Sequence, residues 1–358
     1  MRVLTGTALH PEVFPGAVPG CQKFQFPVGM PEMPPPSIHQ PHDKLLKSTF
    51  SKTENAAAFF KNYLPEALVG FFDWESLRQI PSSFIDPRFL SSESDLVFQV
   101  SYKDHAAVLY LLFEHQSEED TMMAFRLLYY TLQIWQAFRL ENPRAQRLPA
   151  VMGLVLAQNR SPWKSPLSLD ALIDIPAPLE ELLRPLQPKL EFRLVELLKI
   201  PYDQLRGTPE GVLTLRALKA DPVGELLSAP LWDPALLEAV SGDALEWFLR
   251  YALDRHSSRE EIYHWIRNVP SKKLESALMT ITEQIHAEGL TQGRAEGERS
   301  ALRKAVLQAL RIRHGNIPSG IQEELESIGS STLLESLLDS ALRSESVEHF
   351  LRTLHRKT

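Results

Sequence analysis

Apolar residues recur at helical spacing after His42. Six of them lie on or near one stripe: Leu45, Leu46, Phe50, Ala57, Phe60 and Leu64. The stripe predicts a helix with its N-cap at Asp43 that runs to about Tyr63. Pro65 interrupts this pattern, and residues 66–77 form a second, shorter helical candidate.

Two segments with strand character follow. Residues 95–102 are rich in β-forming side chains, and residues 106–113 are apolar on both faces, as expected for a central strand. Lys103 and Asp104 form a tight connection between them. The pattern therefore predicts an antiparallel hairpin in which Asp95 faces Leu112.

A long helix over residues 121–138 is predicted next, with Asp120 as its N-cap. Its apolar stripe contains Phe125, Leu128, Leu132 and Trp135. Residues 149–157 then predict a third strand. A helix, two strands, a helix and a strand together indicate an α/β core.

Beyond residue 165 the pattern is mostly helical, with breaks at prolines. Residues 283–312 predict a long helix with Gly289, Gly293 and Gly297 at every fourth position. Each glycine costs about 1 kcal/mol relative to alanine, so a weak linker helix is the favoured interpretation. The alternative is close approach between helices of a homo-oligomer, because these glycines share one face. A final amphipathic helix is expected over residues 333–342.

The organisation expected from these patterns has four parts. Residues 1–41 hold nine of the 27 prolines and are expected to be a disordered leader, with Met30 or Met33 as alternative starts. Residues 42–165 would form the α/β core and residues 166–282 a helical extension. Residues 283–358 would form the glycine-spaced helix and a C-terminal helical unit.

Composition and charge exclude several classes of protein. Of the 358 residues, 44% are hydrophobic and 23% are charged, as in ordinary globular proteins of about two domains. The single cysteine, Cys21, excludes an intramolecular disulfide and favours a cytoplasmic protein. The longest apolar run, residues 106–113, is too short to span a membrane. The net charge of −7 argues against passive coating of DNA but allows an enzyme with a local DNA-binding patch.

The most informative polar residues are Asp95, Glu114 and Gln116. Strand alternation puts Glu114 and Gln116 on one face, and the predicted hairpin register adds Asp95, although a loop one residue longer would reverse it. Two carboxylates can hold Mg²⁺ or Mn²⁺, and Gln116 can orient water or a phosphate oxygen but cannot act as a base. By spacing alone, a polar exit of the strand from the core is the alternative.

A second candidate feature is a run of cations near the C-terminus. Residues 299–322 contain no acidic residue and five cations: Arg299, Arg303, Lys304, Arg311 and Arg313. A solvated helix face is the favoured interpretation, and contact with DNA through the last four is the alternative.

Four segments, taken in order, carry a family resemblance: residues 42–47 (HDKLLK), 94–97 (SDLV), 114–117 (EHQS) and 123–130 (MAFRLLYY). Together they resemble the recombination-promoting nuclease/putative transposase family of the PD-(D/E)XK nuclease superfamily. The resemblance covers roughly residues 42–160 and is looser over the C-terminal half. It implies a restriction-endonuclease-like core, with a mixed β-sheet flanked by helices, followed by a mostly helical C-terminal region. It also implies Mg²⁺-dependent hydrolysis of DNA.

The resemblance assigns roles to the central residues. Asp95 matches the metal-binding aspartate of the superfamily, although Ser94 precedes it in place of proline. Glu114 matches the acidic residue of the (D/E)XK element and would be the second metal ligand. Gln116 occupies the position of the usual lysine.

Auxiliary roles are implied for four further residues. His42 and Asp43 match an opening His-Asp pair that would approach the site, with a simple helix cap as the alternative. Arg126 and Tyr130 lie four residues apart on one helix face, where they would contact phosphate or the metal-binding strand, or support packing.

One departure affects the expected function. Residues 157–160 (AQNR) stand where the family has a Tyr-His-Gly-like turn, so Asn159 or Arg160 would replace a polar contact there. The expected function is a Mg²⁺-dependent DNA endonuclease linked to recombination or mobile-element biology. The alternative is an inactive nuclease-fold protein that acts as an interaction or assembly module.

Overall fold

The computed structural model describes residues 40–80, 96–102, 108–256, 258–315, 317–318 and 320–357. Within these ranges, only the backbone, and not the side chain, is described for residues 108–112, 114, 259, 288, 292 and 357. The predicted leader, except for its last two residues, and the alternative starts at Met30 and Met33 also lie outside it.

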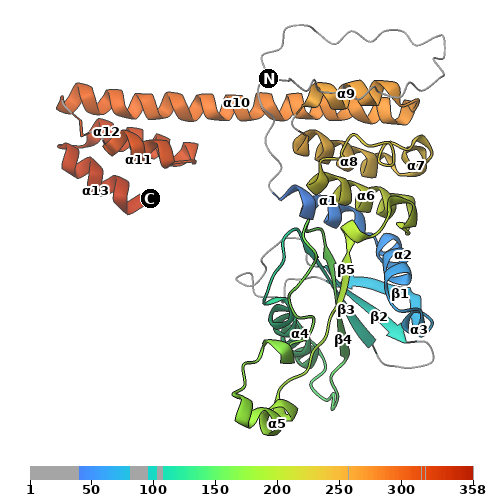
Figure 1. Cartoon of the computed structure of the whole chain (residues 1–358). Coiled ribbons are helices and arrows are strands. Elements are labelled where there is room, and N and C mark those ends of the chain that lie inside the picture. The colour runs from blue at the N-terminus through green and yellow to red at the C-terminus, as the bar shows by residue number, and fades with distance from the viewer. Residues whose placement is uncertain are drawn as a thin grey trace, which may run out of the picture. The chain divides into compact units, whose positions relative to one another are not determined.

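One five-stranded mixed sheet forms the centre of the N-terminal half (Figure 1). Its strands are β1 (Phe72–Ile80), β2 (Leu96–Tyr102), β3 (Val108–Gln116), β4 (Ala150–Ala157) and β5 (Arg193–Glu196). They lie side by side in chain order. The β1–β2 and β2–β3 pairs are antiparallel, whereas β4 is parallel to β3 and β5 is parallel to β4.

Helices cover both faces of this sheet (Figure 1). On one face, α1 (Pro41–Phe50) and α2 (Thr53–Tyr63) bury Phe50 and Phe60 against Phe113 of β3. On the other face, α4 (Met123–Glu141) packs Leu127 into a core that includes Val97 of β2. The sheet therefore separates two apolar cores, as the alternation of side chains along its strands requires.

The close contact between α4 and the sheet depends on a glycine. Gly153 of β4 faces Leu127, and an added Cβ atom would lie 3.1 Å from the Leu127 Cδ1 atom. A larger residue would push the helix away, because buried side chains are packed at nearly crystalline density.

The remaining elements are almost all helical. They are α3 (Glu66–Val69), α5 (Glu180–Leu183), α6 (Pro209–Val223), α7 (Pro234–Ala239), α8 (Gly242–Arg255), α9 (Arg259–Asn268), α10 (Lys272–His314), α11 (Gly320–Ser327), α12 (Ser331–Arg343) and α13 (Val347–Lys357). The core shared by α1, α2 and the sheet continues through α6–α9 to the start of α10. The end of α10 builds a separate core with α11–α13. The expected mixed α/β fold with a helical C-terminal region is confirmed.

Three predicted helices need correction. The single helix over residues 43–63 is two helices with a break at Ser51 and Lys52, and Asp43 lies in the first turn of α1, where Gln40 is the N-cap residue. Residues 72–77 belong to β1 and not to a helix. A register shift in β1 allows Phe72 and Leu77 to be buried together although they are five residues apart. The apolar residues of β1 therefore follow neither the spacing of a helix nor the alternation of a regular strand.

The third correction concerns α4, which exposes half of Phe125 (51%) and Leu132 (50%), two residues of the predicted stripe. Its buried face instead carries Met123, Ala124, Leu127, Tyr130, Thr131 and Ile134. Both faces of this helix are apolar enough that spacing alone does not identify the buried one. Asp120 is not the N-cap residue, although its carboxylate accepts a hydrogen bond from the backbone of Met122.

Two further differences concern the sheet. Leu112 pairs with Val97, a shift of two residues from the predicted partner Asp95, which itself lies outside the described residues. The strand β5 lies beyond residue 165, where the sequence predicts a mostly helical region, and it completes the sheet beside β4.

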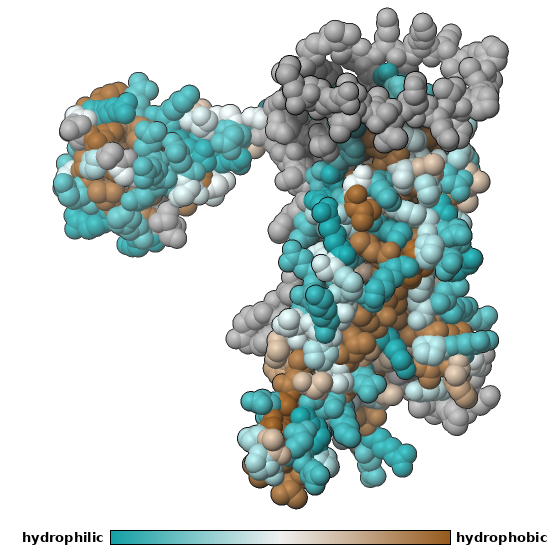
Figure 2. Space-filling model, viewed as in Figure 1, coloured by the Kyte–Doolittle hydropathy of each residue, from teal (hydrophilic) through white to brown (hydrophobic). Residues whose placement is uncertain are grey.

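The region around α5 exposes apolar side chains (Figure 2). Leu182 and Leu186 are 70% and 75% exposed. Among the described helices, none is both long and apolar enough to cross a membrane.

Candidate active site

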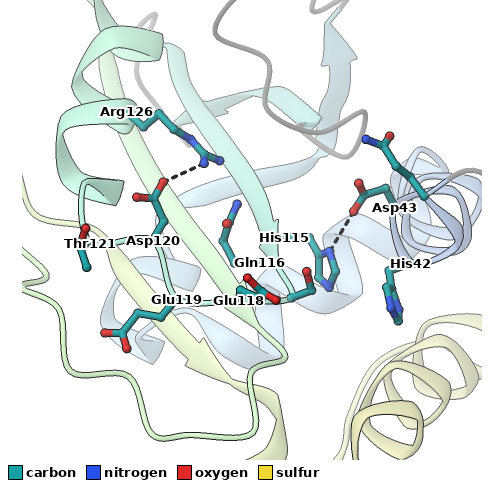
Figure 3. Close-up of a pocket in the computed structure, with 11 residues that line it drawn as sticks. His42, Asp43, His115, Gln116, Glu118, Glu119, Asp120, Thr121 and Arg126 are labelled. Carbon is teal, nitrogen blue, oxygen red and sulfur yellow. Dashed lines mark hydrogen bonds and ion pairs between the residues drawn. The ribbon is translucent and has the colours of Figure 1, made fainter.

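A polar cavity of about 520 Å³ opens at the end of β3 (Figure 3). Its walls come from α1, the last residues of β3, the following loop and the first turns of α4. The lining residues are Gln40, His42, Asp43, His115, Gln116, Ser117, Glu118, Glu119, Asp120, Thr121 and Arg126. The cavity thus lies where a buried strand leaves the core, the place where polar side chains can converge without losing their solvation.

The wall on the α1 side is fixed by a buried imidazole. The Nδ1 atom of His115 lies 3.1 Å from Oδ1 of Asp43, and its Nε2 atom lies 2.9 Å from Oε1 of Gln158. The amide of Gln158 donates to the carbonyl oxygen of Leu218 at 2.6 Å, which fixes its orientation. Both ring nitrogens therefore face oxygen atoms, and His115 ties α1 to β3, β4 and α6.

His42 extends this network toward α8. Its Nδ1 atom lies 2.9 Å from the hydroxyl oxygen of Tyr251, and its Nε2 atom lies 3.5 Å from Oδ2 of Asp221. Burial lowers the pKa of His42 to about 4, although the nearby Asp221 carboxylate opposes the shift. Burial also raises the pKa of Tyr251 well above its usual value. At neutral pH, His42 is therefore uncharged, and its Nδ1 atom shares a hydrogen bond with the Tyr251 hydroxyl.

The opposite wall carries carboxylates that already have partners. Asp120 pairs with Arg126 at 2.8 Å between Oδ2 and Nη1. Glu119 accepts hydrogen bonds from the backbone N–H groups of Lys164 at 2.7 Å and Ser165 at 2.5 Å. A hydrogen bond from the side chain of Ser165, together with these backbone bonds, lowers the pKa of Glu119. These bonds also attach the loop that follows β4 to the rim of the cavity.

The structure brings four of the seven residues predicted for catalytic or auxiliary roles to this cavity. Gln116, His42, Asp43 and Arg126 all line it. Tyr130 does not, since it is buried in the core between α4 and the sheet, which supports its packing role.

The two predicted metal ligands are only partly covered by the description. Asp95 lies outside the described residues, and Glu114 is described only in its backbone, within β3. Among described side chains, His, Cys, Asp and Glu form no group of three or more that could hold a metal. The carboxylates of Asp95 and Glu114 would be suitable oxygen donors for Mg²⁺, and their role as metal ligands stays a prediction.

Two of the four cations predicted to contact DNA have structural partners. Arg303 donates to the carbonyl oxygens of Leu325 and Ile328, and Arg313 donates to those of Leu342 and Ser344. Each arginine thereby binds carbonyl groups at or just after the end of α11 or α12.

Sequence reasoning missed His115 and Gln158 as functional positions. His115 was visible inside the EHQS segment, but the alternation that puts Glu114 and Gln116 on one face puts His115 on the other. Gln158 stands at the departure from the expected Tyr-His-Gly-like turn, where Asn159 or Arg160 was expected to supply the polar contact. Their partners are distant in sequence, so no local pattern reveals them.

Comparison with known proteins defines the family. A family profile described as putative transposase, YhgA-like, matches residues 40–227, more than half of the chain. Recombination-promoting nuclease RpnD of Escherichia coli O157:H7 is 31% identical over 255 residues, which cover 69% of this chain and 94% of RpnD. No solved structure shows a significant match.

Two relatives from Escherichia coli strain K12 differ in their named activity. Inactive recombination-promoting nuclease-like protein RpnE is 27% identical over 286 residues, covering 75% of this chain and 89% of RpnE. Recombination-promoting nuclease RpnA is 32% identical over 96 residues, covering 27% of this chain and 33% of RpnA. The chain therefore belongs to the YhgA-like putative transposase family and is similar to proteins named recombination-promoting nucleases.

Proposed function

We propose that this protein is a metal-dependent endonuclease that hydrolyses phosphodiester bonds in DNA, in the cytoplasm, during recombination or the movement of mobile elements. The register of β2 against β3 carries the proposal. Leu96 pairs with Phe113, and these two residues are the chain neighbours of Asp95 and Glu114. The cavity lined by Gln116 lies at the same end of β3.

In this proposal Asp95 and Glu114 hold Mg²⁺ or Mn²⁺, since both ions accept carboxylate oxygens and keep positions open for water and phosphate. Such an ion, when bound, supplies activation of water and neutralisation of the charge that develops on the phosphate. Gln116 orients the attacking water or a phosphate oxygen through its amide, which does not titrate near neutral pH.

Other residues of the cavity hold β3 in place or bind the substrate in this proposal. The Asp43–His115 pair fixes the end of β3 against α1, so that Gln116 keeps its place in the cavity wall. Arg126 lies in the first turn of α4, where its guanidinium pairs with Asp120 and faces the same space. We propose that it contacts a phosphate of the bound strand.

We also propose that the core is restriction-endonuclease-like and that α10–α13 form a separate assembly unit. A mixed sheet with helices on both faces supports the first point. The separate apolar core of the C-terminal helices supports the second.

The second candidate is a catalytically inactive protein of the same fold, which assembles with itself through the C-terminal helices. It is favoured by the similarity to RpnE, whose name describes it as inactive. The departure from the family's Tyr-His-Gly-like turn at residues 157–160 points in the same direction.

Nicking of supercoiled plasmid with Mg²⁺ or Mn²⁺ tests the proposal. We expect cleavage by the wild type, background rates for Asp95→Ala and Glu114→Ala, and unchanged rates for Glu75→Ala, a control carboxylate that is exposed on β1. Equal cleavage by the wild type and Asp95→Ala would remove the assignment. A folded wild type that neither cleaves DNA nor binds Mn²⁺ in calorimetry would favour the inactive alternative.

A further inference from the structure

Four cationic side chains beside the cavity take no part in the hydrogen bonds and ion pairs that hold the described fold together. Lys44 and Lys47 lie on α1, and Arg160 and Lys164 lie in the loop after β4. The two lysines of α1 are half-buried, and the two cations of the loop are exposed. Within the described ranges, none of these four side chains forms an ion pair or a hydrogen bond with another residue.

The geometry of α1 places its two lysines next to the cavity. Residues three, four or seven positions apart lie on one side of a helix. Lys44 follows Gln40 by four positions, and Lys47 follows Asp43 by four. Gln40 and Asp43 line the cavity, whereas the neighbouring Leu46 is fully buried in the core. Lys44 and Lys47 therefore continue the cavity wall along the solvent side of α1.

The loop after β4 supplies cations on the other side. Glu119, on the cavity rim, accepts hydrogen bonds from the backbone of Lys164 and Ser165. Figure 3 shows Glu119 on the side of Gln116 opposite His42 and Asp43. The loop is thus held beside the cavity, across from α1.

The flanking cations offset the acidic lining of the cavity. Among the described side chains, the lining carries four acidic residues, Asp43, Glu118, Glu119 and Asp120, and one cation, Arg126. With the four flanking cations, the described groups of this region are five cations and four acids. Cations gathered beside one cavity, on a chain of net charge −7, are the pattern by which an acidic protein can still bind a polyanion.

We propose that Lys44 and Lys47 on one side, with Arg160 and Lys164 on the other, form the DNA-backbone contacts of this protein, so that a duplex lies across the cavity. The inference rests on the proposed function and specifies where its substrate binds. The inference places the DNA contacts at the cavity rim and not on α10. In α10, Arg303 and Arg313 bind carbonyl groups of the protein itself.

Fluorescence anisotropy of a labelled 20-base-pair duplex tests this, in EDTA so that no strand is cut. Two double variants remove the proposed contacts: Lys44→Gln with Lys47→Gln, and Arg160→Gln with Lys164→Gln. A matched double variant, Lys304→Gln with Arg311→Gln, removes two exposed cations from α10. Each lost phosphate contact is expected to raise Kd about tenfold at 0.1 M salt. It is also expected to reduce the slope of log Kd against log salt by about 0.9.

The outcomes separate the inference from the proposed function. Weaker binding and a smaller salt slope in both rim variants, with wild-type behaviour in the α10 variant, would support the inference. A wild type that binds the duplex while both rim variants bind equally well would overturn the inference alone. The same holds if only the α10 variant is weakened. A folded wild type without measurable affinity for the duplex would overturn both. Circular dichroism melting checks that each variant folds.

Discussion

Both ring nitrogens of the His115 side chain have a polar partner. Asp43 faces one nitrogen and Gln158 faces the other, and His115 itself is almost fully buried. A buried polar group that loses its partner is costly, because no water replaces the lost bond.

The Asp43→Ala variant is therefore expected to lower the free energy of unfolding by about 3 kcal/mol, since it leaves the buried imidazole without its carboxylate. Urea unfolding at pH 7 measures the loss. Glu75→Ala, which removes an exposed carboxylate of β1, is expected to change the free energy of unfolding by less than about 0.5 kcal/mol. Equal stabilities of the two variants would show that the Asp43–His115 pair does not hold the wall of the cavity.

His42 makes stability depend on pH. Burial lowers its pKa from 6.5 to about 4, so between these values the unfolded chain binds more protons than the folded protein. This contribution to stability is fully present above pH 6.5 and is lost as the pH falls toward 4. The loss is about 2 kcal/mol at pH 5.

Urea unfolding at pH 7 and pH 5 measures this effect. In the His42→Asn variant, the decrease in stability between the two pH values is expected to be smaller by about 2 kcal/mol. An identical decrease in wild type and variant would mean that His42 titrates normally in the folded protein.

Some residues of the candidate site could be predicted from the sequence, and others could not. The segments HDKLLK and EHQS identified His42, Asp43 and Gln116, because these residues combine polar chemistry with the order of a known family. Gln158, directly after β4, and Tyr251, in α8, join the same network. They could not be predicted, because their role arises only when distant segments of the chain meet.

The helix α4 and the strand β4 approach each other closely at Gly153. An alanine there would place its Cβ atom 3.1 Å from Leu127 and 3.4 Å from Phe192, so one of the neighbours must move. The Gly153→Ala variant is expected to lose about 1–2 kcal/mol of unfolding free energy, as in other overpacked cores.

Gly242→Ala is the matched control, since an added Cβ atom at this first residue of α8 meets nothing within 4 Å. It is expected to be neutral or slightly stabilising. Urea denaturation of both variants checks the comparison, and a Gly153→Ala variant as stable as the wild type would show that the contact between α4 and β4 is loose.

In the C-terminal helices, Arg303 acts as a cap. It donates to the carbonyl oxygens of Leu325 and Ile328, at and just after the end of α11. Arg303→Ala is expected to destabilise this unit by about 1–2 kcal/mol, because the carbonyl groups lose charged donors. Lys304→Ala, the exposed neighbour, is expected to have no such effect.

Hydrogen exchange of amides in α11 and α12 measures this change. Faster exchange in Arg303→Ala alone would agree with a capping role. Equal exchange in both variants would contradict it.

Elements with a regular pattern could be predicted, and irregular ones could not. The strands β2, β3 and β4 and the helices α4 and α12 lie close to their predicted ranges, whereas α10 contains its predicted range but begins eleven residues earlier, at Lys272. The strand β1 was missed because its register shift breaks the alternation of apolar residues. The four residues of β5 are too few for any pattern to emerge, and pairing with β4 defines them.

In the whole molecule, residues beyond the region that matches the family profile also contribute to the surroundings of the cavity. The family profile ends at residue 227, whereas Tyr251, which lies 2.9 Å from His42, belongs to α8 beyond that limit. The apolar core likewise continues from the sheet into α8 and the start of α10. Part of the helical region predicted as an extension therefore supports the wall of the candidate active site.

In the proposed active site, Asp95, Glu114 and Gln116 converge on one divalent cation at the end of β3. A crystal structure of the protein soaked with Mn²⁺, with anomalous data, would locate this ion. We expect one anomalous peak beside the cavity, with carboxylate oxygens of Asp95 and Glu114 about 2.2 Å away and the amide of Gln116 facing the same space. A structure in which Asp95 lies on the face of the sheet opposite Glu114 and Gln116, with no Mn²⁺ between them, would contradict this arrangement.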